Sequence, residues 1–152
     1  MIKATTNRVI AFDLDEALSF EGDSGPYLQY SAVRALNIGR RLGEAGLPTE
    51  VSAAEVTALP PEVWDDDLWD LFLAVALVPQ KVEAAGDSLE LSLLARHALE
   101  LAQRFHAIYH RHPILQEQDS GVRNARLATM QVFVQGLTVL SDLLGLPLPD
   151  RM

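Results

Sequence analysis

Residues 119–144 carry a long apolar stripe at helical spacing. The apolar side chains recur every three or four residues, which places them on one face of an α-helix. They are Leu127, Met130, Val134, Leu137, Leu140 and Leu144. Asp119 or Ser120 can cap the start of this helix, because a short polar side chain accepts a hydrogen bond from a free backbone N–H. A helix with one apolar face buries that face against other helices, so the stretch predicts a helical bundle.

Four other segments also predict helices, at residues 26–43, 61–78, 79–85 and 88–111. The longest of these has a second stripe, made of Leu94, Leu101, Phe105 and Ile108. Glycines and prolines between residues 43 and 61 predict a connector, with a short turn of helix at 52–58. We therefore expect an all-α fold: an antiparallel bundle of about four long helices plus a short helix. A single domain, 1–152, would consist of a lead-in segment, 1–25, and the helical bundle, 26–152.

Composition agrees with one globular domain. The chain has 152 residues, of which 49% are hydrophobic and 22% are charged, enough apolar material for a buried core. It contains no cysteine, which excludes disulfides and thiolate metal sites and fits a reducing compartment. We see neither a secretion signal nor an apolar run long enough to span a membrane. A cytoplasmic protein without a membrane partner is expected.

The net charge of −9 is unfavourable for binding nucleic acid, but the charge is unevenly distributed. Residues 44–90 carry eleven acidic side chains and a single lysine. The segments before and after this acidic segment are close to neutral and contain all but one of the basic residues. An RNA-binding face could therefore lie at the two ends of the chain, with weak affinity because phosphate neutralisation supplies most nonspecific binding.

The start of the first predicted helix concentrates aromatic and basic side chains. Ser24 or Gly25 can cap this helix, and Pro26 fits its first turn. Tyr27, Tyr30 and Arg34 follow at spacings of three and four, which place them on one face. Aromatic rings and a planar cation can stack unpaired bases and hold phosphates. The alternative is that both tyrosines pack against the core with their hydroxyls at the surface.

Two groups of residues could suggest a metal site. His106 and His110 lie four apart on one predicted helix, as zinc-binding pairs do, with His112 as the nearest third ligand. No second ligand cluster supports this site, so surface histidines near the RNA face are the preferred interpretation. Asp65-Asp66-Asp67 would fan around a helix start, where negative charge is favoured, rather than converge on one ion. We expect no metal.

The segment Val9-Ile10-Ala11-Phe12-Asp13-Leu14-Asp15 allows an enzymatic alternative. It is similar to the first motif of haloacid-dehalogenase phosphatases, in which a strand precedes a nucleophilic aspartate and a second aspartate two residues later. Glu16-Ala17 stand where that motif has a small hydroxyl residue, and no run of further strands supports a parallel sheet. The phosphatase interpretation is therefore set aside.

Motifs along nearly the whole chain resemble one family. The run Phe20-Glu21-Gly22-Asp23-Ser24-Gly25-Pro26-Tyr27-Leu28-Gln29-Tyr30-Ser31, followed by Arg34, resembles the start of the C-terminal anticodon-binding domain of arginyl-tRNA synthetases. This helical domain is named after the tetrapeptide Asp-Ala-Leu-Arg. Val122-Arg123-Asn124-Ala125-Arg126-Leu127 resembles the family's Val-Arg-x-Ala-Arg-Leu, and Leu143 to Met152 resembles its closing run.

The resemblance implies recognition of the anticodon arm of arginine tRNA by an arginine–tRNA ligase. Bases would stack on aromatic faces while polar groups read their edges. The implied tRNA-binding residues are Tyr27, Tyr30, Arg34, Tyr109, Arg126, Arg151 and Met152. No cofactor is expected for this domain, whereas ATP and magnesium are expected for the full-length enzyme. We expect a monomer.

The family's catalytic motifs, His-x-Gly-His and Lys-Met-Ser-Lys-Ser, do not occur in the chain, and the Asp-Ala-Leu-Arg tetrapeptide would lie just before Met1. The missing catalytic domain is thus an expected partner, and this chain alone should not aminoacylate tRNA. It is either a piece of a longer synthetase or a free-standing module. The alternative function is a helical module that docks on a protein through the acidic segment, without RNA.

Overall fold

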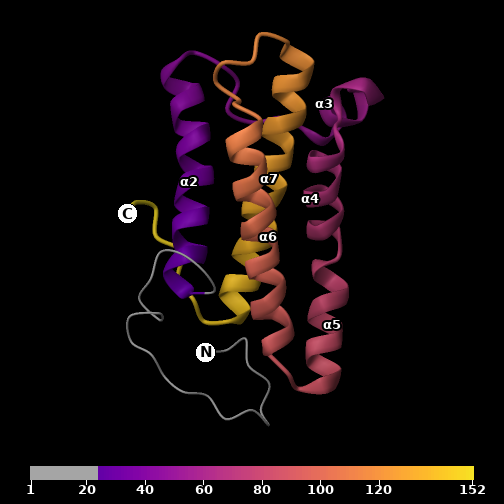
Figure 1. Cartoon of the computed structure of the whole chain (residues 1–152), viewed down its shortest axis with the longest axis vertical. Helices are drawn as coiled ribbons and strands as arrows, with labels where there is room; N and C mark the ends of the chain where they lie inside the picture. The colour runs from indigo at the N-terminus through magenta and orange to yellow at the C-terminus, as the bar shows by residue number, and fades with distance from the viewer. Residues whose placement is uncertain (1–23) are drawn as a thin grey trace.

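The computed structural model describes residues 24–152. Its helices are α2 (Gly25–Glu44), α3 (Ala53–Ala58), the 3-10 helix η1 (Pro61–Val63), α4 (Asp66–Ala76), α5 (Val78–Ser88), α6 (Ser92–Arg111) and α7 (Ser120–Leu143) (Figure 1). These residues include no strand, and the predicted all-α bundle is confirmed. Segment 1–23, which holds the phosphatase-like motif around Asp13, lies outside the described residues.

Two long helices, α6 and α7, form the centre of the bundle and run antiparallel. α2 packs against both of them on one side, and α4 and α5 lie nearly end to end on the other (Figure 1). The acidic segment supplies α3, α4 and α5, so most of its charge lies across the central helices from α2. The acidic helices and α2 therefore lie on opposite sides of the central helices, and α2 belongs to one of the two nearly neutral segments of the chain.

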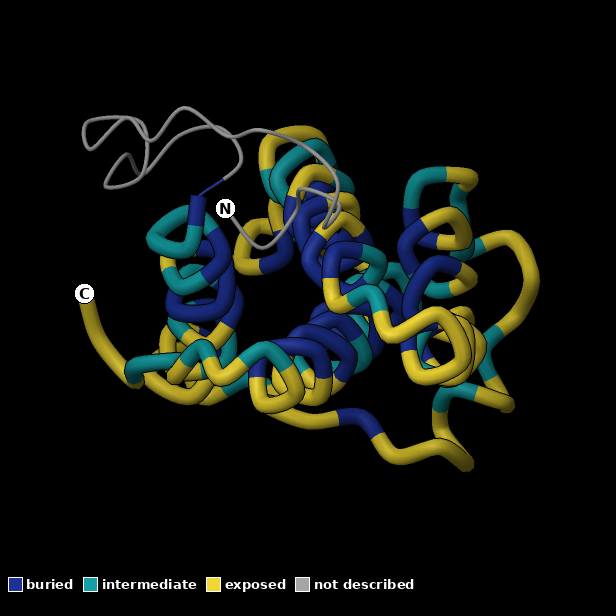
Figure 2. Tube along the Cα trace, turned by 90° about the horizontal axis from the view of Figure 1, so that it is seen from below, coloured by how far each residue is buried: buried dark blue, intermediate teal, exposed yellow. Residues whose placement is uncertain are grey.

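The apolar stripes of the helices meet in one core. Phe105 of α6 and Phe133 of α7 are fully buried, and their rings stack with centroids 4.5 Å apart. Figure 2 shows the buried stretches turned toward the middle of the bundle, with exposed residues on the outside. Leu127, Met130, Leu137 and Leu140 of the predicted stripe are buried. The periodicity of residues 119–144 therefore identified the face of α7 that forms the core.

Short polar side chains fix the helix starts. The Ser24 hydroxyl accepts a hydrogen bond from the Tyr27 N–H at the start of α2, 3.2 Å between heavy atoms. Asp119, one of the two caps that the sequence allows, caps α7 in the same way through the Val122 N–H, at 2.9 Å. Each cap satisfies a backbone N–H that has no partner within the helix.

Three helix boundaries differ from the prediction. Residues 61–78 form η1 and then α4, because Asp65 caps a new helix by accepting from the Leu68 N–H. α5 continues through Gly86 to Ser88, since an internal glycine weakens a helix without ending it. It ends at Leu89, whose φ of 54° is in the left-handed region, and α6 begins only at Ser92.

Two helical glycines give a matched test of the packing. A methyl group added at Gly136 of α7 would lie 2.7 Å from Cγ1 of Val75 on α4, whereas one added at Gly39 of α2 meets no neighbour within 4 Å. We expect Gly136→Ala to lower the free energy of unfolding by about 1–2 kcal/mol, because overpacking exceeds the gain in helix propensity. Gly39→Ala should raise it by about 0.5–1 kcal/mol. Urea unfolding followed by circular dichroism measures both, and a stabilising Gly136→Ala would contradict the close contact of α4 with α7.

Candidate nucleic-acid interface

The face of α2 that carries aromatic and basic residues lies against α6. Tyr27, Tyr30 and Arg34 come from successive turns of α2, and the facing turns of α6 contribute His106 and Tyr109. Tyr27 is half-buried, and its ring stacks on that of His106 with centroids 5.1 Å apart. Tyr30 is 38% exposed, with its ring 5.9 Å from His106 and nearly parallel to it. The two tyrosines thus share one neighbour but differ in access to solvent.

Arg34 is held between aromatic rings. The central carbon of its guanidinium lies 3.7 Å from the ring centroid of Tyr109 and 5.7 Å from that of Tyr30. A guanidinium over an aromatic ring is attracted by the negative face of the ring. No carboxylate among residues 24–152 forms an ion pair with Arg34. The site therefore presents a positive charge that the described part of the chain does not neutralise.

His106 connects Arg34 to the backbone of α2. Its Nδ1 lies 3.3 Å from Nη1 of Arg34, and its Nε2 lies 2.9 Å from the Ser31 hydroxyl, which donates to the Tyr27 carbonyl. Arginine can only donate, so Nδ1 must be the accepting nitrogen and Nε2 must carry the proton. The neutral Nε2–H tautomer satisfies each of the hydrogen bonds that link Tyr27, Ser31, His106 and Arg34. Because both ring nitrogens are engaged, His106 is not placed to form the zinc pair with His110.

The surroundings of His106 disfavour its charged form. Burial, and then the positive charges of Arg34 and His110, lower the pKa of His106 from 6.5 to about 4. Protonation at Nδ1 would replace an acceptor with a second donor facing the Arg34 guanidinium. Near neutral pH the ring is therefore neutral and able to accept from Arg34.

This depressed pKa predicts a pH dependence of stability. Above pH 6.5 the imidazole is neutral in both the folded and the unfolded chain. As the pH falls from about 6.5 to about 4, the unfolded chain takes up a proton that the folded chain resists, so the contribution of His106 to stability is lost over this window. Urea unfolding at about pH 7 and about pH 5 should show a larger loss for the native protein than for His106→Asn. Equal losses would contradict the depressed pKa.

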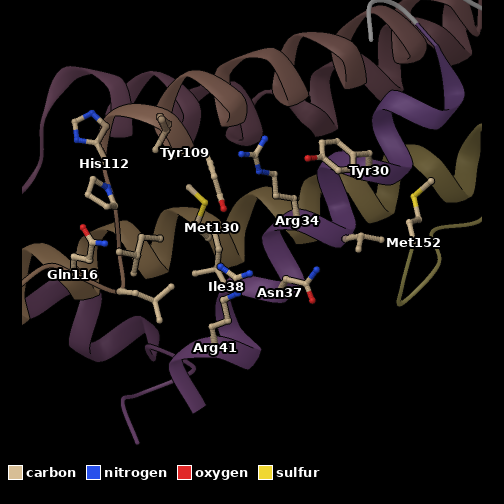
Figure 3. A pocket seen from close by; sticks show the side chains of 15 residues that line it. Tyr30, Arg34, Asn37, Ile38, Arg41, Tyr109, His112, Gln116, Met130 and Met152 are labelled. Carbon is tan, nitrogen blue, oxygen red and sulfur yellow. The ribbon is translucent and has the colours of Figure 1, made fainter. Parts of the chain in front are cut away.

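A groove opens beside this cluster, along α2, α6 and the loop that follows α6 (Figure 3). Its volume is about 440 Å³. Tyr30, Arg34, Asn37 and Arg41 line it from α2, and Tyr109 faces them from α6 (Figure 3). A cavity of this size, with rings, amides and cations on its walls, has the dimensions and the chemistry to receive a planar polar group.

The groove combines three kinds of interaction. The exposed ring of Tyr30 can stack on a planar group, and the side-chain amides of Asn37 and Gln116 can donate and accept hydrogen bonds. Arg34 and Arg41 add positive charge, and neither has a carboxylate partner among residues 24–152. Neighbouring Arg40, by contrast, pairs with Glu44. Stacking, amide contacts and unpaired cations together suit a nucleotide.

Comparison with known proteins assigns the family. The family model of the DALR anticodon binding domain matches residues 28–152, which is most of the chain. The chain belongs to the DALR anticodon-binding domain family. This DALR domain is 36% identical over 150 residues to the arginine–tRNA ligase of Alkaliphilus metalliredigens and 37% identical over 150 residues to that of Maricaulis maris. Each alignment covers 97% of the chain.

A solved structure agrees with the fold. The DALR domain superposes on the arginyl-tRNA synthetase of Thermus thermophilus with a TM-score of 0.80 and 32% sequence identity, over 99% of its own length. It covers only 25% of that protein, as it does of the Alkaliphilus ligase, and 23% of the Maricaulis ligase. The chain thus spans about a quarter of the length of these relatives. The described helices of the DALR domain include none long and apolar enough to cross a membrane.

Arg126, also predicted as a tRNA contact, does not line the groove of the DALR domain. Its guanidinium donates to the Pro113 carbonyl at 2.9 Å and pairs with Glu117 at 2.8 Å. Only 13% of its side chain is exposed. These bonds tie α7 to the loop between α6 and α7, so the contacts of Arg126 are structural.

The C-terminal residues do reach the groove. Met152 lines it, and Arg151 lies in an adjoining hollow beside Arg40 and Glu44. The Gln29 side chain donates to the Pro147 carbonyl at 2.8 Å, which fastens the tail of the DALR domain to α2. Arg151 and Met152 are therefore close enough to Arg34 to take part in the same binding site.

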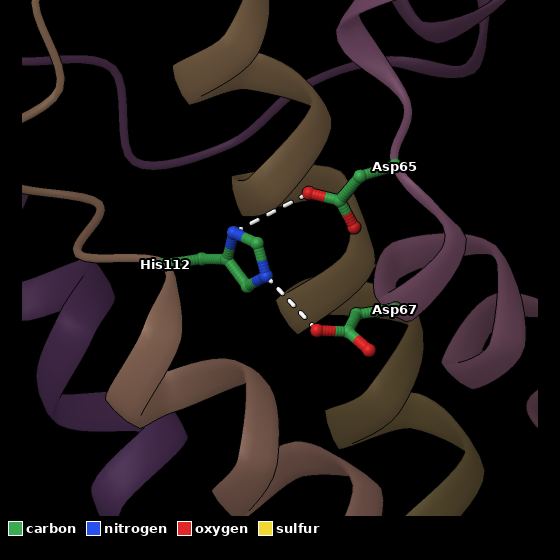
Figure 4. A group of neighbouring side chains, drawn as sticks. All are labelled: Asp65, Asp67 and His112. Atoms are coloured by element: carbon green, nitrogen blue, oxygen red, sulfur yellow. Dashed lines mark hydrogen bonds and ion pairs between the residues drawn. The ribbon is translucent and has the colours of Figure 1, made fainter.

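At the far end of the groove, His112 meets two aspartates (Figure 4). Its Nδ1 lies 3.3 Å from Asp65 and its Nε2 lies 3.2 Å from Asp67, which also pairs with Arg111 at 2.7 Å. The sequence predicts aspartates that fan apart, but Asp65 is the cap residue, with extended backbone angles that turn it toward His112. One possible ligand atom from each of Asp65, Asp67 and His112 lies within 4.8 Å of the others, but each carboxylate already pairs with a different ring nitrogen of His112. We interpret the cluster as a polar contact between the start of α4 and the end of α6.

Sequence reasoning does not single out two residues of the groove, Asn37 and Gln116, nor His106, which lies outside the groove, as a partner of Arg34. Asn37 lies three residues after Arg34 and seven after Tyr30, so helical spacing alone could have placed it on the same face. Gln116 lies in a loop, where no periodicity applies. The pairing of His106 with Arg34 joins residues 72 positions apart and leaves no local signal.

Proposed function

We propose that this DALR domain binds the anticodon arm of arginine tRNA as part of an arginine–tRNA ligase. The observation that carries this proposal is the guanidinium of Arg34, held over Tyr109 in an open groove without a carboxylate partner among residues 24–152. An unneutralised cation beside an exposed ring suits RNA, which offers phosphates and unstacked bases together. The relatives named above, which are arginine–tRNA ligases, support arginine tRNA as the ligand.

In the proposed mechanism, the residues of the groove have different roles. A splayed base stacks on the exposed ring of Tyr30, while the amides of Asn37 and Gln116 contact its edge. Arg34 and Arg41 hold phosphate oxygens or a base edge, and Met152 with Arg151 covers the side formed by the C-terminus. Tyr27 supports the site from behind through its stack on His106.

The distribution of charge makes binding dependent on the rest of the enzyme. The domain carries a net charge of −9, and eleven of its 21 acidic residues lie in the acidic segment, whose helices α3, α4 and α5 lie away from α2. Arg34 and Arg41 offer phosphates positive charge at the groove, but long-range repulsion by the net negative charge weakens the complex of the isolated domain. We propose that the catalytic domain of a longer cytoplasmic ligase, acting with ATP and magnesium, supplies the remaining tRNA contacts and the chemistry. We also propose that the domain is monomeric.

A titration with two RNAs tests the proposal. Arginine tRNA and a version altered in its middle anticodon base would be added to the protein at about 50 mM and about 150 mM salt. We expect tighter binding of the intact tRNA at both salt concentrations, and weaker binding of both RNAs at the higher one. Equal affinity for the two RNAs, or no binding at low salt, would contradict anticodon recognition by this domain.

One observation favours the alternative of a protein-docking module. Trp69 and Leu73 of α4 lie four residues apart, Leu77 follows four residues later at the end of α4, and all three are exposed within the acidic segment. An apolar strip among acidic side chains fits a protein partner with a basic and apolar surface. α4 lies across the central helices from α2, so docking on this strip is compatible with RNA binding in the groove beside α2. Docking on a protein partner becomes the preferred function only if the titration detects no RNA complex.

A further inference from the structure

We infer that His106 is a positioning residue, whose unprotonated Nδ1 holds the Arg34 guanidinium over Tyr109 in the orientation that receives RNA. The inference rests on the proposed function of the groove. His106 does not line the groove, so it acts through Arg34 and not by touching the ligand. It adds to the site a residue that the sequence offered only as a zinc ligand or a surface histidine.

The hydrogen bonds around His106 have a fixed direction. Starting from the backbone, the Ser31 hydroxyl donates to the Tyr27 carbonyl at 2.7 Å, and Nε2–H of His106 donates to Ser31 at 2.9 Å. This order leaves Nδ1 as an acceptor, and it accepts a hydrogen bond from Nη1 of Arg34 at 3.3 Å. This series of hydrogen bonds therefore begins at the Tyr27 carbonyl in a rigid helix and ends at the Arg34 guanidinium.

Ring contacts hold the imidazole in its plane. The ring of His106 stacks on those of Tyr27 and Tyr30, at interplanar angles of 27° and 11°. It also meets the edge of the buried Phe105 ring, with centroids 5.3 Å apart. With the ring fixed on these sides, Nδ1 points in one direction, toward Arg34. The protein thereby orders the guanidinium before any ligand arrives.

This ordering matters because arginine has a long and flexible side chain. Immobilising such a side chain during binding costs conformational entropy. His106 and Tyr109 have already restricted Arg34 in the free protein, while its remaining N–H groups stay available for a phosphate or a base edge. Removing the acceptor at Nδ1 should therefore weaken RNA binding even if the fold is unchanged.

Two substitutions of nearly equal shape separate positioning from packing. In His106→Asn, the amide oxygen takes the place of Nδ1 and can accept from Arg34, whereas His106→Leu fills the same space with a methyl group. Both variants lose the bond to Ser31, so they differ chiefly in the acceptor offered to Arg34. Thermal unfolding of each variant checks that the fold is retained.

The affinity for arginine tRNA at low salt is the first readout. We expect His106→Leu to bind about fivefold more weakly than the native protein and His106→Asn to recover to within about twofold of it. Leu and Asn variants of equal affinity, or a Leu variant that binds like the native protein, would overturn the inference. Arg34→Ala is measured alongside. If Arg34→Ala leaves binding unchanged, the proposed function of the groove fails, which is a separate result.

A second readout needs no RNA. Nitrogen NMR of the native protein should show a neutral His106 ring with its proton on Nε2, and side-chain relaxation should show a restricted Arg34 guanidinium. The guanidinium should become more mobile in His106→Leu than in His106→Asn. A proton on Nδ1, or equal mobility of Arg34 in the two variants, would overturn the inference whatever the ligand of the groove.

Discussion

Replacing Phe133 with alanine should lower the free energy of unfolding by about 3–5 kcal/mol. Its ring is fully buried in the middle of α7 and stacks on Phe105, at an interplanar angle of 4°. Truncation removes a large apolar surface from the core and leaves a cavity that the rigid central helices cannot close. Urea unfolding followed by circular dichroism measures the loss, and it is large against the usual stability of a domain of this size.

Val139→Ala, six residues later on α7, is the matched control. Val139 is 47% exposed, so its truncation uncovers no cavity, and alanine is the better helix former. We expect a change within about 0.5 kcal/mol. Similar losses at the two positions would contradict the assignment of α6 and α7 as the centre of the bundle.

Arg34→Ala should lower the affinity for arginine tRNA by about tenfold or more at low salt. The substitution removes a cation that has no carboxylate partner among residues 24–152 and that lies ordered over Tyr109. Because Arg34 makes no ion pair there, its loss should change the stability of the fold little. Fluorescence titration gives the affinity, and thermal unfolding gives the stability.

Arg96→Ala controls for the lost charge. Arg96 is an exposed residue of α6 that does not line the groove, and within residues 24–152 its guanidinium bonds only to the carbonyl of Ser92. Both variants change the net charge equally, so a general electrostatic effect would weaken binding equally. We expect Arg96→Ala to change the affinity by less than about twofold. An equal effect of the two substitutions would contradict a specific site at Arg34.

Periodicity predicted those parts of the fold that depend on neighbours within one helix. The stripe of residues 119–144 identifies the buried face of α7, and Asp119 is one of its two predicted caps, because the cap bond from Val122 to Asp119 spans only four consecutive residues. The aromatic spacing at Tyr27, Tyr30 and Arg34 likewise placed them on one face of α2. Such signals are local, so they can be read from the sequence alone.

Features that depend on tertiary contacts were not predictable in this way. α5 passes through Gly86 and ends at Leu89 in the left-handed region, although glycine is the residue that such a conformation favours. Asp65 turns toward His112 because it caps α4, and its partner lies 47 residues away in the sequence. Arg126 bonds to Pro113 and Glu117 in the loop before α7, and no local pattern in the sequence predicts these two contacts.

The most direct measurement is a double-mutant cycle that changes one residue of the groove and the anticodon of the tRNA. The affinities of the native protein and Arg34→Ala are measured for arginine tRNA and for a tRNA altered in its anticodon. If the groove receives anticodon nucleotides, the two changes are coupled, and Arg34→Ala loses most of the preference for the intact anticodon. If Arg34→Ala weakens both RNAs by the same factor, or neither, the groove between α2 and α6 is not the site of anticodon recognition.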